Sequence, residues 1–325
     1  MDPAQLSTRL AATVAAQPCL GNPPVVRTAP ESSWPDVLAD FADRRYADAE
    51  PLVRVAVSDG TPSRLLIAAH HGAVDGFGLL ALLGLALDAP IASNAHGIGD
   101  RPAARSFLHA SAVRLAEAVF TPPSRAATST PAGAVGDAMV AVELPAVRAG
   151  TATLTVATAA AVRAWNDDHG VATPRVVAAL GASRRPGSAL APDRYTAFFR
   201  LRVPPGADPA TVRRLLAEIA PEPDFPPSRS RTARPLIRAL SHRLGATFLA
   251  SNLGVVCTPA PVESLAFYPA PSGRQGLAIG AVTCGDVTTV SVRARRTGFA
   301  DGAAERVLKL VVERLTDGAA ARRTP

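Results

Sequence analysis

The order of patterns in residues 64–90 constrains this chain more than any other feature. Residues 65–69 are all apolar and too few for a comfortable helix, so they favour a buried β-strand. His70 and His71 follow directly and lead into a glycine-rich turn. Residues 79–87 are almost entirely leucine and alanine, which are good helix formers. We therefore expect a strand, a loop that carries two imidazoles, and a buried helix.

A histidine at a strand end is often only packed and hydrogen-bonded, but this pair is followed by Asp75 and Gly76 in the pattern H-H-x-x-x-D-G. A chain of this composition would contain that pattern by accident with a probability of about 1 in 2,000. A metal site is disfavoured, because adjacent strand residues point to opposite faces and His70 and His71 cannot easily hold one ion. The motif therefore favours catalysis without a metal.

His70, His71, Asp75 and Gly76 resemble the HHxxxDG signature of the chloramphenicol acetyltransferase superfamily, which includes nonribosomal peptide condensation domains and carrier-dependent acyltransferases. Further segments resemble family landmarks in the same order along the chain, at residues 1–18, 154–169, 175–186 and 251–254. Only HHxxxDG is specific by itself. The resemblance implies a mixed α/β fold in which two subdomains, each a mixed sheet packed with helices, form a pseudo-dimer around a substrate channel.

By this resemblance His71 is the catalytic base and His70 a structural neighbour. A thioester carbonyl is already electrophilic, so the enzyme mainly has to deprotonate an amine or alcohol and stabilise the tetrahedral oxyanion. An imidazole with a pKa near neutrality suits the first task. The small Gly76 would let substrate approach the backbone, and its amide could help hold the developing charge.

Asp75 has two interpretations. It could orient His71 as in a catalytic triad, but in the family the equivalent carboxylate generally turns away and pairs with an arginine on a strand of the second half. We favour the structural role, with Arg184 or Arg185 as the partner.

The same resemblance places second-half residues along the substrate channel. Ser251 and Asn252 are expected to contribute a hydroxyl and an amide that bind a pantetheine arm or an oxyanion, and Tyr195 is a further candidate. Ordinary strand-end hydrogen bonding is almost as good an interpretation of Ser251 and Asn252.

The implied donor is a thioester of coenzyme A or of the phosphopantetheine of an acyl or peptidyl carrier protein, the acceptor is a small amine or alcohol, and no cofactor is tightly bound. Heterocyclising relatives carry aspartates in place of the two histidines, so the presence of both histidines argues against that activity. The additional motifs of the epimerising and plant relatives are absent, which argues against those activities as well. Two alternatives stay open: a catalytically silent module that binds carrier proteins, to which an abbreviated N-terminus gives some weight, and a thioester hydrolase.

Composition narrows the partners. The formal charge of +7 is not gathered into a tail or an aromatic-studded strip, which argues against nucleic acid. Arginines concentrate in the second half, either as a solvated surface or as a patch for an anionic partner. Three distant cysteines and no CxxC indicate reduced thiols. No segment reads as an export signal or membrane span, so we expect a cytoplasmic protein. We also expect it to be a monomer.

The 325 residues are expected to form two cores. Residues 121–133 lack apolar periodicity and are rich in Pro, Ser, Thr and Ala, so we predict an N-terminal subdomain at 1–133, which carries HHxxxDG, and a C-terminal subdomain at 134–325, which completes the channel. Periodicity predicts helices at 4–16, 34–41, 79–87, 103–118, 151–165, 209–219, 236–244 and 303–315, and strands at 52–57, 64–71, 140–144, 176–180, 195–203, 250–256, 276–282 and 288–292.

Overall fold

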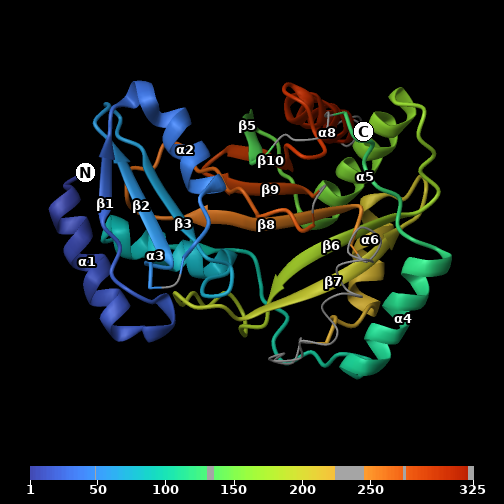
Figure 1. The fold of residues 1–325 in the computed structure, drawn as a ribbon, viewed down its shortest axis with the longest axis horizontal. Helices are drawn as coiled ribbons and strands as arrows, with labels where there is room; N and C mark the ends of the chain where they lie inside the picture. The colour runs from blue at the N-terminus through green and yellow to red at the C-terminus, as the bar shows by residue number, and fades with distance from the viewer. Residues whose placement is uncertain (48, 130–134, 224–244, 274–275, 321–325) are drawn as a thin grey trace.

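The computed structural model describes residues 1–47, 49–129, 135–223, 245–273 and 276–320, which form two sheets with helices packed against each (Figure 1). The helices are α1 (Pro3–Ala16), α2 (Trp34–Asp43), α3 (Gly76–Leu87), α4 (Phe107–Phe120), α5 (Thr151–Asp168), α6 (Pro209–Glu218) and α8 (Ala303–Ala320). The strands are β1 (Val26–Ala29), β2 (Val53–Ser58), β3 (Leu65–Ala69), β4 (Ala92–Ser93), β5 (Asp137–Pro145), β6 (Val176–Ser183), β7 (Thr196–Val203), β8 (Phe248–Cys257), β9 (Leu277–Cys284) and β10 (Val287–Arg295).

The smaller sheet has the order β1-β2-β3, with β1 parallel and β3 antiparallel to β2. The helices α1 and α3 pack against one face, and their shared core includes Leu6, Leu10, Val55 and Leu82. Helix α2 covers the other face through Trp34 and residues around it. The strand β3, which precedes the histidine pair, is therefore an edge strand of this sheet.

The larger sheet has the order β5-β10-β9-β8-β6-β7, and β4 pairs with β8. It is also mixed, since β6, β8 and β9 are parallel neighbours while β7 and β10 run antiparallel to theirs. The helices α5 and α8 lie together over this sheet, and the largest core cluster lies between them and the strands (Figure 1). Both sheets are thus mixed and helix-packed, which confirms the expected fold class.

The two halves share a third cluster. Phe77 and Leu80 of α3 pack with Leu253 and Val256 of β8 and with Val282 of β9. The short strand β4 belongs to the first half of the chain and joins the larger sheet. The predicted boundary near 133 lies in a segment whose residues 130–134 are outside the described part of the chain.

Most predicted elements are present with ends shifted by a few residues, while β1 and β4 were not predicted. The predicted helix at 236–244 lies outside the described residues. The helical spacing of Phe107, Val113, Leu115 and Val119 makes these residues of α4 available for burial. Val113, Leu115 and Val119 are nevertheless 40%, 38% and 48% exposed, and α4 buries Ala110 and Ala118 instead. Within the described part of the chain, no helix combines the length and apolar character needed to cross a bilayer.

Candidate active site

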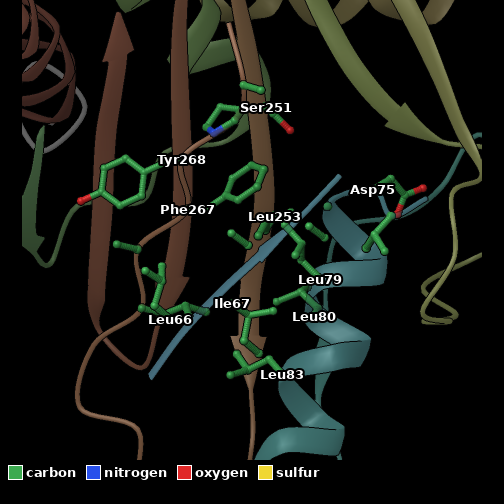
Figure 2. Close-up of a pocket in the computed structure, with 18 of the residues that line it drawn as sticks. Leu66, Ile67, Asp75, Leu79, Leu80, Leu83, Ser251, Leu253, Phe267 and Tyr268 are labelled. Atoms are coloured by element: carbon green, nitrogen blue, oxygen red, sulfur yellow. The ribbon is translucent and has the colours of Figure 1, made fainter. Parts of the chain in front are cut away.

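A cavity of about 2360 Å³ lies between the halves, and both contribute to its wall. The first half supplies β3, the histidine pair and the inner face of α3, and the second half supplies parts of β6, β7 and β8 and residues 260–270. Figure 2 shows Leu79, Leu80 and Leu83 of α3 beside β8, with Leu79 and Leu80 close to Leu253 and Ser251 farther along the same strand. The wall combines apolar side chains with many polar and charged ones, among them Arg64, Glu143 and Arg293.

His71 lies where β3 gives way to the loop and lines the cavity, and its imidazole is 6.2 Å from the Phe198 ring of β7, centroid to centroid. The His71 side chain is solvent-accessible from the cavity. The surrounding protein nevertheless partly desolvates the imidazole, which lowers its pKa below the ordinary 6.5. Desolvation is the main cause, and the positive charge of Arg194 adds to it, while a backbone hydrogen bond to Val74 opposes both. The imidazole is therefore neutral at physiological pH, the protonation state of a general base.

His70 also lines the cavity, but its ring is held by its neighbours. The Gly72 amide donates a hydrogen bond of 3.1 Å to Nδ1 of His70, and the Tyr46 ring meets the imidazole edge-on with centroids 5.3 Å apart. The Arg54 guanidinium stacks on Tyr46 at 3.9 Å. His70 thus has defined packing partners on the side of α2, and His71 is the histidine that faces the second half.

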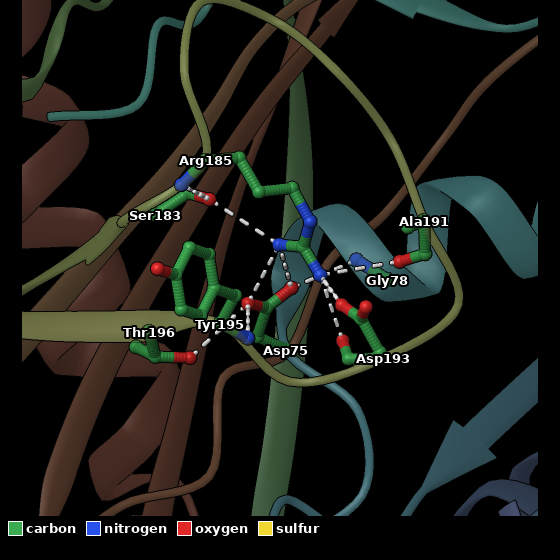
Figure 3. A network of polar contacts seen from close by, with 8 residues as sticks. All are labelled: Asp75, Gly78, Ser183, Arg185, Ala191, Asp193, Tyr195 and Thr196. Atoms are coloured by element: carbon green, nitrogen blue, oxygen red, sulfur yellow. Dashed lines mark hydrogen bonds and ion pairs between the residues drawn. The ribbon is translucent and has the colours of Figure 1, made fainter. Parts of the chain in front are cut away.

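Asp75 is 5% exposed and is fully engaged by groups other than His71 (Figure 3). Its Oδ1 accepts from the Gly78 amide at 2.8 Å, which caps the N-terminus of α3, and Arg185 donates to both carboxylate oxygens at 3.0 and 2.9 Å. Oδ2 also accepts from the Tyr195 amide at 2.9 Å and the Thr196 hydroxyl at 3.2 Å. Five contacts occupy a group with about four lone-pair sites, so none is left to orient His71 as in a triad.

Arg185 is the arginine that pairs with Asp75, and it is itself 5% exposed. Its other contacts are the Ser183 hydroxyl, the Ala191 carbonyl, and both the carbonyl and the carboxylate of Asp193 (Figure 3). Arg184, the other candidate partner, instead donates to the Arg101 carbonyl at 3.4 Å. The Asp75–Arg185 pair therefore links the start of α3 to the segment between β6 and β7.

The glycines at the start of α3 permit close packing. A Cβ on Gly76 would lie 2.8 Å from a Leu253 methyl, so the absent side chain brings α3 against β8. A Cβ on Gly78 would lie 2.5 Å from the Asp193 carbonyl oxygen and 2.7 Å from Val74 Cγ1. Sequence reasoning singled out Gly76 but missed Gly78, whose position in the first helical turn carried no signal of this contact.

Ser251 and Asn252 of β8 both line the cavity, but they differ in what their side chains do. The Asn252 amide donates to the Ala149 carbonyl at 2.5 Å, and its oxygen accepts from the Gly254 amide at 2.8 Å, at a register irregularity of β8 against β9. These contacts agree with the alternative interpretation of Asn252, ordinary hydrogen bonding to nearby backbone. The Ser251 hydroxyl has no hydrogen-bond partner among the described residues, and it faces the cavity (Figure 2).

Tyr195 is not part of the cavity wall. Its side chain is 46% exposed, and its contributions are the amide that contacts Asp75 and a carbonyl that accepts from the Arg184 amide at 2.7 Å. The sequence did not point to Thr196, Asp193 or Tyr46, because single polar residues and a lone tyrosine carry no motif. Arg194 belongs to the second-half arginines already noted as a possible patch for an anionic partner, but not as a neighbour of His71. In the described part of the chain, no three His, Cys, Asp or Glu side chains lie close enough together to hold a metal ion.

Solved structures share this fold. The first condensation domain of the calcium-dependent antibiotic synthetase, in complex with a substrate analogue, superposes with a TM-score of 0.60 at 16% identity, over 98% of this chain and 89% of that chain. The starter condensation domain of rhizomide synthetase, in complex with C8-CoA and Leu-SNAC, gives 0.57 at 12% identity over 98% and 86%. The X-domain from teicoplanin biosynthesis, in complex with OxyB, gives 0.53 at 14% over 98% and 86%.

No family model and no curated protein sequence matches the chain. The fold is therefore that of the condensation domains of nonribosomal peptide synthetases, which is also the class that the HHxxxDG resemblance predicts. The match extends over nearly the whole chain, including both sheets. At identities of 12 to 17% the shared property is the fold, and the reaction has to be argued from the site.

Proposed function

We propose that this protein is a condensation-type acyltransferase, which moves an acyl or aminoacyl group from a thioester of coenzyme A or a carrier protein to an amine or alcohol, in the biosynthesis of a natural product. The observation that carries the proposal is the position of His71 at the wall of a cavity formed by both halves, where burial lowers the pKa of its imidazole and so favours the neutral base. A cavity of this kind offers a meeting point for two substrates.

The chemistry needs one proton transfer and one oxyanion site. His71 takes the proton of the acceptor as its nitrogen or oxygen attacks the thioester carbonyl. The tetrahedral intermediate then collapses, the carbon–sulfur bond breaks, and the thiolate leaves and receives the proton. The Ser251 hydroxyl and the Gly76 amide are the groups proposed to donate hydrogen bonds to the oxyanion.

Mass spectrometry of reactions with a panel of acyl-CoA and acyl-carrier donors, each with and without amine and alcohol acceptors, tests this function. His71→Ala should lower the rate by roughly 10²- to 10⁴-fold, the usual contribution of a general base. The matched control is His109→Ala, because His109 is exposed on α4 and away from the cavity wall. Full turnover by His71→Ala would show that His71 is not the base.

A partner-binding module is the second candidate, because the fold also occurs in an X-domain solved in complex with OxyB. That candidate predicts binding of a carrier or another protein with no product from any donor. A hydrolase of the same fold would release free acid at the same rate whether or not an acceptor is present. The acceptor panel therefore separates the three functions.

A further inference from the structure

The strand β3 leaves one edge unpaired next to the candidate base. It pairs with β2 only, and within the described residues no other strand lies on its second side. In Figure 1 it is the strand of the smaller sheet that faces the larger one. An open strand edge carries a row of backbone donors and acceptors that can pair with another extended chain.

The register identifies which backbone groups lie on that open edge. Ser58 donates to the Arg64 carbonyl at 2.9 Å and His70 donates to the Leu52 carbonyl at 2.8 Å, so these are hydrogen-bonded pairs of the antiparallel ladder. Hydrogen-bonded and non-hydrogen-bonded pairs alternate, and Val55 opposite Ile67 is therefore a non-hydrogen-bonded pair. The outward N–H and C=O groups accordingly belong to Leu65, Ile67 and Ala69, and no hydrogen bond to them is present among the described residues.

The open edge faces the cavity. If only one face of β3 bordered the cavity, alternate residues would line it, because side chains alternate across a strand. Instead, every residue from Leu65 to Ala69 lines the cavity and every one is half-buried. The neighbouring strand β2 is buried at five of its six positions. The cavity therefore reaches the backbone edge of β3 as well as its side chains.

The edge leads directly to the base. The outward groups recur every second residue, about 7 Å apart, which is the repeat of an extended peptide. The next position in that series is His71, whose side chain lines the same cavity. Apolar side chains flank the edge, with Leu79 and Leu83 of α3 on one side and Phe267 across the space (Figure 2). An extended chain on this edge would place its reacting end at the imidazole and its side chains against apolar walls.

We propose that the acyl donor binds by adding a strand to the free edge of β3, so that its acyl group is a peptide-like chain with backbone amides rather than a plain alkyl chain. This inference rests on the proposed acyl transfer. A peptide-like chain satisfies the outward groups of Leu65, Ile67 and Ala69 while it displaces water. An alkyl chain would strip water from these groups and leave them unpaired, and a site built for hydrogen bonds discriminates against such a ligand.

The test is a scan of the donor. N-acetylcysteamine thioesters of a short apolar peptide are prepared with one amide N-methylated at a time, and kcat/KM is measured with a fixed acceptor. Methylation of an amide that faces β3 removes a hydrogen bond and introduces a clash, so we expect about a tenfold loss at every second amide and little change between them. An alkyl thioester of equal length should react more slowly than the parent peptide.

A protein variant tests the same contact from the other side. Ile67→Pro removes an outward N–H and leaves the ladder with β2 intact, which edge strands tolerate. It should slow the parent peptide donor and add little to the loss caused by methylation of the facing amide, since the two changes remove one interaction. If this variant does not fold, as judged by circular dichroism, the donor scan alone decides.

The outcomes separate the two proposals. If no donor of any length yields product, the proposed acyl transfer fails. If the parent peptide is transferred but the methylation scan is flat, or the alkyl donor reacts equally well, acyl transfer stands and strand addition on β3 is overturned. A loss of kcat/KM at every second methylated amide supports both proposals.

Discussion

The ionisation of His71 links its surroundings to the expected pH dependence. Crowding by protein and the charge of Arg194 both lower its pKa below 6.5, so the neutral base is favoured. Activity that needs neutral His71 should therefore rise as the pH increases through a value below 6.5 and approach its plateau above pH 7. A kcat/KM profile whose main rise instead lies between pH 7 and 8 would contradict this assignment.

Arg194→Gln isolates the contribution of charge. It removes a nearby cation, so the pKa of His71 should move up toward 6.5 and the acid limb of kcat/KM should shift to higher pH, while the rate at pH 8 stays close to wild type. The shift should be modest, because Arg194 is exposed and water screens its charge. Arg148→Gln, at an exposed arginine paired with Asp286, is the matched control and should leave the limb in place.

The Asp75–Arg185 pair makes a separate prediction about stability. Both side chains are about 5% exposed, so Asp75→Asn leaves a buried guanidinium without its main counter-charge. The free energy of unfolding should fall by about 3 kcal/mol, and activity should fall with it. Asp286→Asn, in an exposed ion pair, should cost at most about 1 kcal/mol. An unchanged melting temperature together with a large loss of rate would support the triad interpretation instead.

At the residue scale the sequence could locate the motif but not the contacts around it. HHxxxDG is local, so His71 and Asp75 could be found by pattern, and the resemblance narrowed the partner of Asp75 to two arginines. Choosing Arg185 over Arg184 depends on which side chain points across to α3, and that follows from the path of the segment after β6. Tyr195 was placed in the channel, yet its side chain is exposed and only its amide reaches Asp75.

Helix α3 depends on a close approach at its first turn. A Cβ on Gly78 would collide with the Asp193 carbonyl and Val74, whereas a Cβ on Gly76 would clash with the flexible end of Leu253 and make an ordinary contact with Phe267 at 3.6 Å. Gly78→Ala should therefore destabilise the protein by about 1 to 3 kcal/mol, and Gly76→Ala by less, because Leu253 can rotate away. Urea unfolding of the two variants compares them directly. Equal costs would show that the contact with Asp193 does not limit the packing.

The elements that the sequence predicted are those with a strong period or a long apolar run, such as α1, α5 and β7. The strand β1 was missed because it has four residues and no alternation, and β4 because it has two. The prediction of which α4 residues are buried was wrong. The spacing of its leucines and valines fits an amphipathic helix, but this helix packs through alanines and an ion pair of Glu117 with Arg175. Periodicity indicates a helix, but tertiary contacts decide which face is buried.

At the scale of the whole molecule, contacts between the halves lie around the cavity. The Asp75–Arg185 pair is one of them. Another involves Asp137 at the start of β5, whose side chain is 0% exposed and forms ion pairs with Arg293 and Arg295. Its amide donates to the Asp43 carboxylate of α2 at 2.8 Å, and Arg293 also donates to the Ala42 carbonyl. These contacts, with the shared cluster of α3 and β8, couple the first sheet to the second.

This coupling predicts a single cooperative unfolding transition, although the sequence suggests two subdomains. The two tryptophans of the chain report on different halves, since Trp34 packs on the smaller sheet and Trp165 lies in the core of the larger one. Trp34→Phe and Trp165→Phe each leave one reporter. In each variant, urea unfolding followed by tryptophan fluorescence should have the same midpoint as unfolding followed by far-ultraviolet circular dichroism, because neither half can lose its structure without exposing the interface of the other. A Trp34 transition that precedes the circular dichroism transition would show that the first sheet unfolds alone, and that the contacts around the cavity are too weak to hold the histidine loop against the second half.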